Sequence, residues 1–374
     1  MNPSWFVYKM YRVTRMLSVL CASIVLLAAG VHAASYTKSL KIVASDSEGY
    51  PLSYPSAIFY DSLYDEIYVT DEGKGQLVIY GSDYFPKFSV GAGRGLYPVY
   101  GSYIRDELIY ACVGLQTDGN PHILVMNKAL LPVKKIFFSG FPGSADFIPR
   151  KLAVAEDGTI YVVGLRSSFV IVLDAEGVYQ RTIEPRVEAL GVIEKAPIVS
   201  LVLASDGTLM FLSEEFGKVF VYDKNEKFLY SFGEKGGVAG KLARPKGLAL
   251  DEKNRRIYIA DYLRHAVSAY SFGGEYLFEF GGKGVRRGWF QYPTDIAVDA
   301  KGNLVVADTW NDRVQIFRVD EVSNEVLLGL DAGGEEKKVR ATRTPKRKIV
   351  PEQKKKAAGK WLEGAEGGAA PSDF

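Results

Sequence analysis

Six copies of one short pattern follow one another along this chain, and their regular spacing restricts the fold more than any other feature. In the clearest copy, YPTDIAVDAKGNLVVADTWNDRVQIF at residues 292–317, a proline precedes an apolar run ending in Asp, and a second run ends in Ala-Asp. The copies begin at Pro55, Pro98, Pro149, Pro197, Pro245 and Pro293. Their starts lie 43, 51, 48, 48 and 48 residues apart. A period of this length indicates an array in which each unit packs on its neighbours.

Each copy contains the pattern of several short strands. The run after the proline is rich in Leu, Ile, Val and Ala, which suits a strand buried on both faces. A tight turn with Gly or Asn follows, as at residues 299–303, and then come a second and a third apolar run. A fourth, more aromatic run is present in several copies, for example at residues 227–233 and 275–281. We therefore predict an all-β fold, namely a six-bladed β-propeller of four-stranded antiparallel blades.

Two segments compete to complete the last blade. One is SLKIVAS at residues 39–45, and the other is NEVLLGL at residues 324–330. The first segment is favoured, because a strand from one end of the chain then holds the other end in the ring.

The last third of the chain resembles the NHL repeat. That repeat has a Gly-rich lead-in with Phe, a Pro, an apolar run ending in Asp, a Gly-Asn turn, Ala-Asp and an Asn-x-Arg segment before another strand. The matching residues are Gly288, Phe290, Pro293, Asp299, Gly302, Asn303, Ala307, Asp308, Asn311, Arg313 and Phe317. The resemblance extends over roughly residues 38–320 and implies a six-bladed propeller of an exported bacterial type, but no single activity.

The two ends of the chain differ from the repeats. Lys9, Arg12 and Arg15 precede the apolar run MLSVLCASIVLLAAG and then VHAA, which is the pattern of a cleavable signal peptide at residues 1–34. The alternative is an uncleaved membrane anchor, although the run is shorter than a spanning helix requires. We expect an exported protein of the periplasm, the extracellular space or the cell surface, with its propeller at residues 35–330.

Charge is distributed unevenly along the sequence. The whole chain has 46 Lys and Arg, 44 Asp and Glu and a net charge of +2. Residues 331–374 hold eleven basic and seven acidic side chains without apolar periodicity, which predicts a disordered basic tail. This tail is expected either to contact a membrane or cell-wall surface or to be a solvated extension. Since the body is mildly acidic and carries an export signal, we expect no nucleic-acid partner.

The connectors between blades carry the candidate binding residues. All such connectors emerge on one face of a propeller, and here they are rich in basic and aromatic side chains. The candidates are Arg94, Arg150, Arg244, Lys246, Lys283, Arg286, Arg287, Trp289 and Tyr292. Arg and aromatic residues are favoured anchors at interfaces, and clustered positive charge attracts anions. The alternative is that the Lys and Arg side chains only keep exposed loops soluble.

The sequence favours binding over catalysis. We predict a monomeric, exported, non-catalytic scaffold that binds a protein or an anionic envelope component on this face, with no catalytic residue. The alternative is a metal-dependent lyase or lactonase-like hydrolase with its site in the central channel. Only His122 and His265 follow the signal segment, which excludes a zinc site with several His. Asp and Asn are plentiful enough for a calcium site, but no clustered spacing supports a metal or another cofactor.

Asp308, Asn311 and Arg313 are interpreted as structural residues. Part of this trio recurs at Asp261 and Arg264, and recurrence around a ring points to architecture, since an active site is normally built once. An Asp at the end of a strand accepts hydrogen bonds across the following turn. We therefore expect these residues to fix a hairpin.

Overall fold

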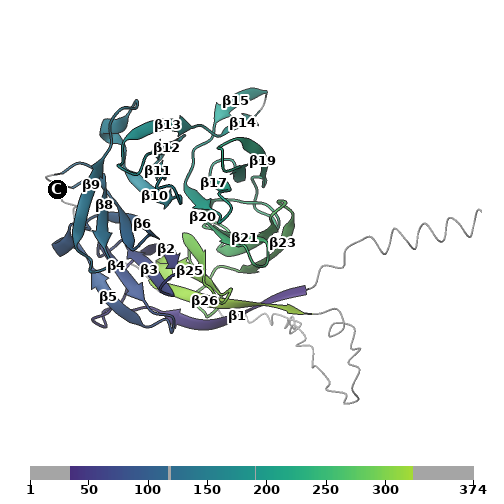
Figure 1. Cartoon of the computed structure of the whole chain (residues 1–374). Coiled ribbons are helices and arrows are strands. Elements are labelled where there is room, and N and C mark those ends of the chain that lie inside the picture. Colours follow the sequence, from purple (N-terminus) through teal and green to yellow (C-terminus); the bar gives the residue numbers. More distant parts are fainter. Residues whose placement is uncertain (1–33, 117–118, 190, 323–374) are drawn as a thin grey trace, which may run out of the picture. The chain divides into compact units, whose positions relative to one another are not determined.

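The computed structural model describes residues 34–116, 119–189 and 191–322. This part of the chain forms six antiparallel sheets of four strands, arranged as blades around a central channel (Figure 1). The predicted all-β, six-bladed propeller is therefore confirmed. An additional two-stranded sheet lies between blades three and four.

Blades one to three follow one another along the chain, and each is a meander of consecutive strands. Blade one contains β2 (Pro55–Asp61), β3 (Glu66–Asp71), β4 (Gln76–Tyr80) and β5 (Pro86–Val90). Blade two contains β6 (Val99–Arg105), β7 (Leu108–Val113), β8 (His122–Asn127) and β9 (Pro132–Phe137). Blade three contains β10 (Pro149–Val154), β11 (Ile160–Gly164), β12 (Val170–Leu173) and β13 (Tyr179–Ile183).

The last three blades include the one that closes the ring. Blade four contains β16 (Ser200–Leu203), β17 (Leu209–Ser213), β18 (Lys218–Tyr222) and β19 (Phe228–Phe232). Blade five contains β20 (Pro245–Asp251), β21 (Arg256–Asp261), β22 (Ala266–Ser271) and β23 (Tyr276–Gly281). Blade six contains β24 (Asp295–Val298), β25 (Leu304–Asp308), β26 (Arg313–Val322) and β1 (Ala34–Val43).

Strand β1 closes the ring by pairing antiparallel with β26, with Ser39 opposite Phe317 and Val43 opposite Val314. The favoured closing segment is therefore confirmed at residues 39–43. The competing segment at residues 324–330, the tail beyond it and the predicted signal segment up to residue 33 lie outside the described residues. Among the described residues, no helix has the length and apolar character needed to cross a bilayer.

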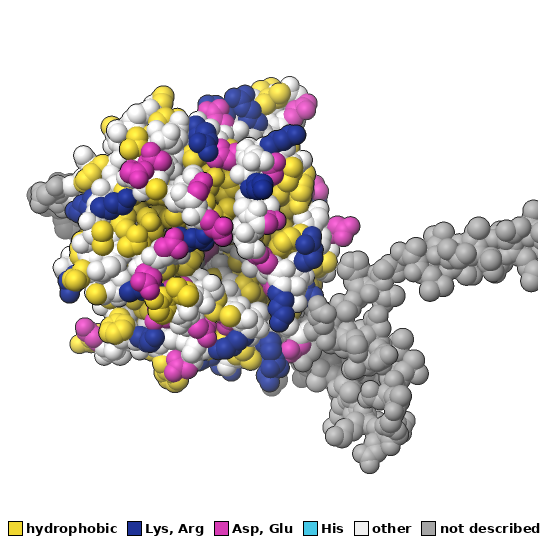
Figure 2. Space-filling model, in the orientation of Figure 1, with side chains coloured by type: hydrophobic (Ala, Val, Ile, Leu, Met, Phe, Trp, Pro, Cys, Tyr) yellow, Lys and Arg dark blue, Asp and Glu magenta, His cyan; other side chains and the backbone are white. Residues whose placement is uncertain are grey.

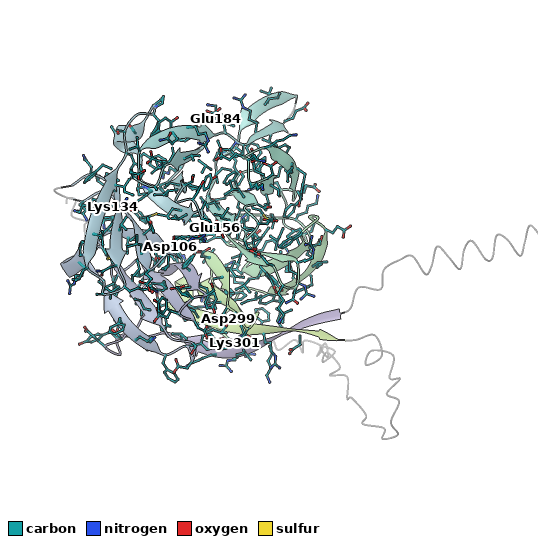
Figure 3. All side chains as sticks on the ribbon, viewed as in Figure 1. Asp106, Lys134, Glu156, Glu184, Asp299 and Lys301 are labelled. Atoms are coloured by element: carbon teal, nitrogen blue, oxygen red, sulfur yellow. The ribbon has the colours of Figure 1, made fainter. Side chains whose placement is uncertain are left out.

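The strand order defines two faces of the propeller. Each connector leads from the outer strand of one blade to the start of the inner strand of the next. Because neighbouring strands in a blade are antiparallel, the turns between second and third strands lie on the same face as the connectors. We call this face the connector face. The turns between first and second strands lie on the other side, the turn face. Figures 1 and 3 look onto the turn face, where Asp106, Glu156 and Asp299 occupy such turns. Figure 2 shows charged side chains of both signs interspersed with apolar patches there.

The core lies between neighbouring blades rather than at the channel. In one cluster, buried Cys112 and Val125 of blade two pack with Leu152 and Val154 of blade three. Each sheet has to bury both of its faces, which explains why the strands read as continuous apolar runs. Burial raises the pKa of the Cys112 thiol.

Some elements were not predicted from the repeat. A hairpin of β14 (Arg186–Ala189) and β15 (Val192–Lys195) extends the connector between blades three and four (Figure 1). Three short 3-10 helices lie in connectors or turns on the connector face, and they are η1 (Ala92–Arg94), η2 (Ser144–Asp146) and η3 (Thr309–Asn311).

Candidate functional site

The predicted site residues all lie on the connector face or at the starts of inner strands, but they do not form one cluster. Six are exposed, namely Arg94, Arg244, Lys283, Arg286, Arg287 and Trp289. Three are half-buried, namely Arg150, Lys246 and Tyr292. These residues share the connector face, but sharing a face does not bring them together in one site.

Arg244 and Lys246 meet at a carboxylate from the preceding blade. Both donate to Glu214, which follows β17 in blade four. Burial raises the pKa of the Glu214 carboxyl, but the hydrogen bonds from the two cations outweigh it and hold that pKa below its ordinary value. The Arg244 guanidinium also lies 5.4 Å from the ring centre of Tyr262, within cation–π range. These two basic groups are therefore fixed in place and partly neutralised.

A continuous row of aromatic side chains begins next to Arg244. We call this row the aromatic arc, and it consists of Tyr262, Tyr292, Trp310 and Tyr54. The ring centres of Tyr262 and Tyr292 lie 4.6 Å apart. Tyr292 and Trp310 are separated by 5.0 Å, and Trp310 and Tyr54 by 5.8 Å. All three contacts fall in the range of favourable aromatic pairs. The arc crosses blades five and six and ends at the entry to blade one.

Buried aspartates hold the backbone on which the arc is mounted. Asp71, Asp261 and Asp308 each end the second strand of a blade. Each accepts a hydrogen bond from a backbone N–H of the connector that leads into that blade. Asp71 accepts from Ser53 N at 2.7 Å, Asp261 from Arg244 N at 3.0 Å, and Asp308 from Gln291 N at 2.6 Å. The donors Ser53 and Gln291 directly precede the arc residues Tyr54 and Tyr292, and the donor Arg244 directly precedes the proline that starts β20. The connectors are therefore fixed before any partner binds.

The structural interpretation of Asp308, Asn311 and Arg313 is confirmed. Asn311 Nδ2 lies 2.8 Å from Asp308 Oδ2, and Arg313 Nε lies 2.6 Å from the same oxygen. Gln315 Nε2 donates to that oxygen as well, at 2.9 Å. The Asp308 side chain is fully buried, so its charge is compensated by these donors. At the corresponding place in blade five, Arg264 pairs with Glu279 instead.

His265 positions the central tyrosine of the arc. Its Nδ1 accepts a hydrogen bond from Tyr292 N at 3.0 Å, and the two rings lie 4.4 Å apart. Tyr292 has φ of +52°, a conformation that non-glycine residues seldom adopt without support. Burial lowers the pKa of His265, and the positive charge of Lys283 adds to this effect. The neutral imidazole is therefore the form that supports Tyr292.

This contact predicts a pH dependence. The folded-state pKa of His265 lies below its unfolded value of about 6.5, so its contribution to stability is complete above that pH. It is lost as the pH falls from about 6.5 through the lowered pKa. We expect the melting temperature of wild type to fall over this window. His265→Asn keeps an acceptor but does not titrate, so it should flatten this part of the profile; an unchanged slope would contradict the role of His265.

Other predicted residues lie away from the arc. Arg287 Nη2 donates to Leu40 O of the outer strand β1 at 3.4 Å. The Trp289 indole packs beside the backbone of Gly282 and Gly284 in its own connector. No described contact joins these side chains, or Arg94, to the arc. They are exposed basic and aromatic groups on the same face, not members of the cluster.

Sequence reasoning missed three of the four arc residues. Tyr54, Tyr262 and Trp310 come from three separate repeats, and they are brought together by the packing of blade five on blade six and by the closure of the ring between blades six and one. A local signal did exist: Tyr54 directly precedes a repeat-starting proline, while Tyr262 and Trp310 directly follow a strand-ending Asp or its neighbour.

An ion pair spans the channel beneath this face. Lys151 Nζ of blade three lies 2.7 Å from Asp295 Oδ1 of blade six, on the opposite side of the ring. Asp295 Oδ2 also accepts from Ile58 N of blade one at 2.9 Å. A Cβ atom at Gly247 would lie 2.5 Å from the Asp295 Cα, so only glycine fits there. Among the described residues, no group of three or more His, Cys, Asp or Glu side chains is arranged to hold a metal ion.

Comparison with known families supports this architecture. The NHL repeat family matches residues 290–317, and a family described as 6-bladed beta-propeller matches residues 194–281. No curated protein shows significant sequence similarity to this chain.

Several solved structures share the fold at low sequence identity. A protein of unknown function from Bacteroides thetaiotaomicron is 12% identical, with 77% of this chain and 76% of that chain covered and a TM-score of 0.56. An auxiliary nutrient binding protein from the same organism is also 12% identical, with 77% of each chain covered and a TM-score of 0.56. Virginiamycin B lyase from Staphylococcus aureus is 12% identical, with coverage of 78% and 89% and a TM-score of 0.49. Such likeness shows the fold alone. With six four-stranded blades and an NHL match in the last of them, this chain is a six-bladed β-propeller that carries an NHL repeat at residues 290–317.

Proposed function

We propose that this protein is an exported, non-catalytic binding scaffold that recognises a protein or an anionic envelope component through its connector face. The observation that carries the proposal is the aromatic arc with Arg244 at its end. Hot spots at interfaces are enriched in Trp, Tyr and Arg, and Tyr and Trp bury large areas at a low cost in side-chain entropy.

The arc is both accessible and held in place. Trp310 is 50% exposed and Tyr54 is 38% exposed, so both have surface left to bury. At the same time, Tyr54 N donates to Asp312 Oδ1 at 2.8 Å, and His265 holds Tyr292. A surface that is ordered beforehand loses less entropy on binding.

Exposed basic residues elsewhere on the connector face favour an anionic partner. Arg94, Lys283, Arg286 and Arg287 are exposed on this face, and exposed charges outside the centre of an interface mainly raise association rates and select the sign of the partner. Export is proposed from the N-terminal segment, and the basic tail is proposed as a second, electrostatic contact with a membrane or cell-wall surface. The scaffold is proposed to act as a monomer.

Replacing Trp310 with Ala is expected to weaken partner binding by at least about 2 kcal/mol, or roughly 30-fold, as is typical of a hot spot. Purified protein is immobilised and exposed to the envelope fraction of the producing cell, and the affinity of the retained species is then measured. Treatment of that fraction with protease distinguishes a protein partner from an envelope polymer. The melting temperature should change little, since half of the Trp310 side chain is in solvent.

Leu63→Ala is the matched control. Leu63 is an exposed apolar residue in the β2–β3 turn, on the turn face. Retention by wild type and Leu63→Ala, but not by Trp310→Ala, would support the proposal. Equal retention by all three proteins would show that the connector face is not the binding surface.

A further inference from the structure

The channel widens into a cavity on the turn-face side of the Lys151–Asp295 ion pair. Its volume is about 740 Å³, and all six inner strands line it. The lining starts directly beyond the ion pair, at residues such as Ile58 and Leu248, and continues into the turns that follow the inner strands. The ion pair therefore forms the floor, and the mouth lies on the face opposite the aromatic arc. The volume falls in the range typical of small-molecule sites, about 300–1,000 Å³.

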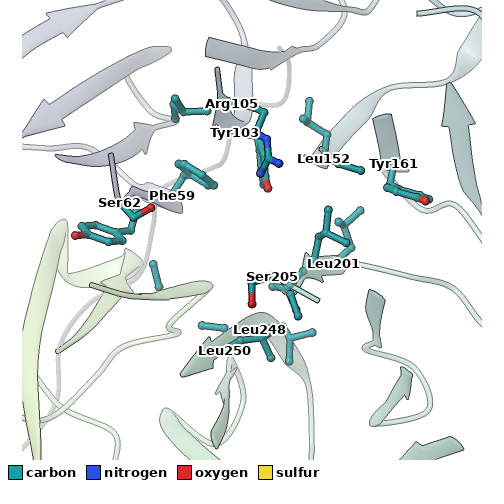
Figure 4. Close-up of a pocket in the computed structure, with 18 of the residues that line it drawn as sticks. Phe59, Ser62, Tyr103, Arg105, Leu152, Tyr161, Leu201, Ser205, Leu248 and Leu250 are labelled. Carbon is teal, nitrogen blue, oxygen red and sulfur yellow. The ribbon is translucent and has the colours of Figure 1, made fainter. Parts of the chain in front are cut away.

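Apolar side chains form the central part of this cavity's wall, and polar groups line the rest of it. Phe59, Tyr103, Leu201, Leu248 and Leu250 surround its centre (Figure 4). The Phe59 and Tyr103 rings lie 4.6 Å apart and tilted by 51°, which makes one wall aromatic. Phe59, Tyr103 and Leu250 remain partly exposed although they lie inside the ring. Covering this surface with an apolar ligand would remove it from water.

Besides Lys151 of the floor, two basic residues, Arg105 and Lys224, line the cavity. Arg105, at the end of β6, has a 28% exposed side chain and is among the cavity-lining residues (Figure 4). Its nearest carboxylates are Asp106 at 3.9 Å and Glu156 at 3.7 Å. Both distances exceed hydrogen-bond length, and both carboxylates are strongly exposed, at 82% and 90%. The guanidinium donors are therefore not committed to either carboxylate.

The other carboxylates at the mouth are already engaged. Asp157 accepts from Thr159 N at 2.9 Å within its own turn. Glu252 accepts from Ser205 N at 2.8 Å. Asp61 pairs with Lys128 at 2.5 Å. These negative charges would still repel a ligand with several negative charges, so the mouth suits a single anionic group placed at Arg105.

We propose that this cavity binds a small amphiphilic monoanion, such as a medium-chain carboxylate, with its carboxylate on Arg105 and its apolar part against the inner strands. A guanidinium can bind a carboxylate through two parallel hydrogen bonds, while the aliphatic and aromatic walls accept the chain. This site is separate from the connector face, so the two proposals stand or fall independently.

The test uses the full chain with decanoate and its uncharged counterpart decanol, both measured by calorimetric titration at pH 8. Wild type should bind decanoate more tightly than decanol. Arg105→Gln should lose roughly tenfold to a hundredfold in decanoate affinity, as expected for a lost charged hydrogen bond, while its decanol affinity stays unchanged. Lys253→Gln is the charge-matched control, because Lys253 is an exposed residue of the β20–β21 turn that is not among the cavity-lining residues; it should behave as wild type.

A second variant tests the apolar part of the site. Leu203→Trp should fill the cavity and weaken binding of both compounds, provided that its melting temperature matches wild type. Trp310→Ala should leave decanoate binding unchanged. The proposal is overturned if wild type does not bind decanoate, or if Arg105→Gln binds decanoate as tightly as wild type does.

Discussion

Replacing Lys151 with Met is expected to lower the free energy of unfolding by about 3–5 kcal/mol, because it leaves the charge of Asp295 buried and unpaired. The Asp295 side chain is only 4% exposed, and Lys151 is its ion-pair partner at 2.7 Å. The pair joins blades three and six across the ring. Equilibrium unfolding in urea measures the loss directly, since a change in midpoint at constant slope reports stability.

The double variant Lys151→Met with Asp295→Asn separates the charge from the packing. Asn keeps an oxygen that can accept from Ile58 N, whereas the buried charge is gone. We expect most of the lost stability to return, because neutral replacements of buried ion pairs are often nearly neutral in effect. If Lys151→Met alone lowered the free energy of unfolding by less than about 1 kcal/mol, the typical value of a surface ion pair, the Lys151–Asp295 ion pair would not span the channel in solution.

The blade architecture was predictable because it depends on local patterns. Gly or Asn provides the turns between strands, and the second apolar run of each copy is buried on both faces. The runs after the prolines were expected to be buried in the same way, but they mix buried and partly exposed residues because they line the channel. The copies that start at Pro98 and Pro197 also form full four-stranded blades. The start of a strand was less predictable: β2, β10 and β20 begin at the proline itself, whereas β16 begins at Ser200 and β24 at Asp295, after the proline.

The partners of the charged residues were not predictable. Counting Lys and Arg in the connectors could not show that Arg244 and Lys246 share Glu214. That carboxylate belongs to the previous blade, and only the packing of blade four on blade five brings the three groups together. Composition therefore describes the charge of a surface, but not which charges are free to bind a ligand.

The complete aromatic arc and the cavity depend on ring closure, because each combines residues from distant repeats. Tyr54 and Trp310 come from opposite ends of the repeat array, and the cavity takes residues from all six inner strands. The sequence could indicate that a propeller forms, but the residues that face each other across it follow from the number of blades and the register of the closing strand.

Removing strand β1 is expected to have the largest effect of all. A chain that starts at residue 44 loses the outer strand of blade six, which is the link between the two ends of the ring. It exposes the edge of β26, and it removes buried Val43 from a cluster that joins blades six and one. An unprotected edge strand is also a template for aggregation. We expect a loss on the order of the whole stability of a typical domain, about 5–15 kcal/mol, seen as the absence of a cooperative thermal transition.

A chain that starts at Ala34 is the matched control, since it lacks the predicted signal segment but keeps β1 intact. It should unfold cooperatively at the wild-type temperature, and the difference between the two truncations then measures the strand alone. The arc makes a further readout possible, because Tyr54 lies just after the closing strand and contacts Trp310 across the junction. Opening the ring should therefore shift Trp310 fluorescence even where single blades survive. If the chain starting at residue 44 kept the cooperative transition and the native fluorescence, the ring would close without β1. The positions of the arc and the cavity would then not depend on the pairing of β1 with β26.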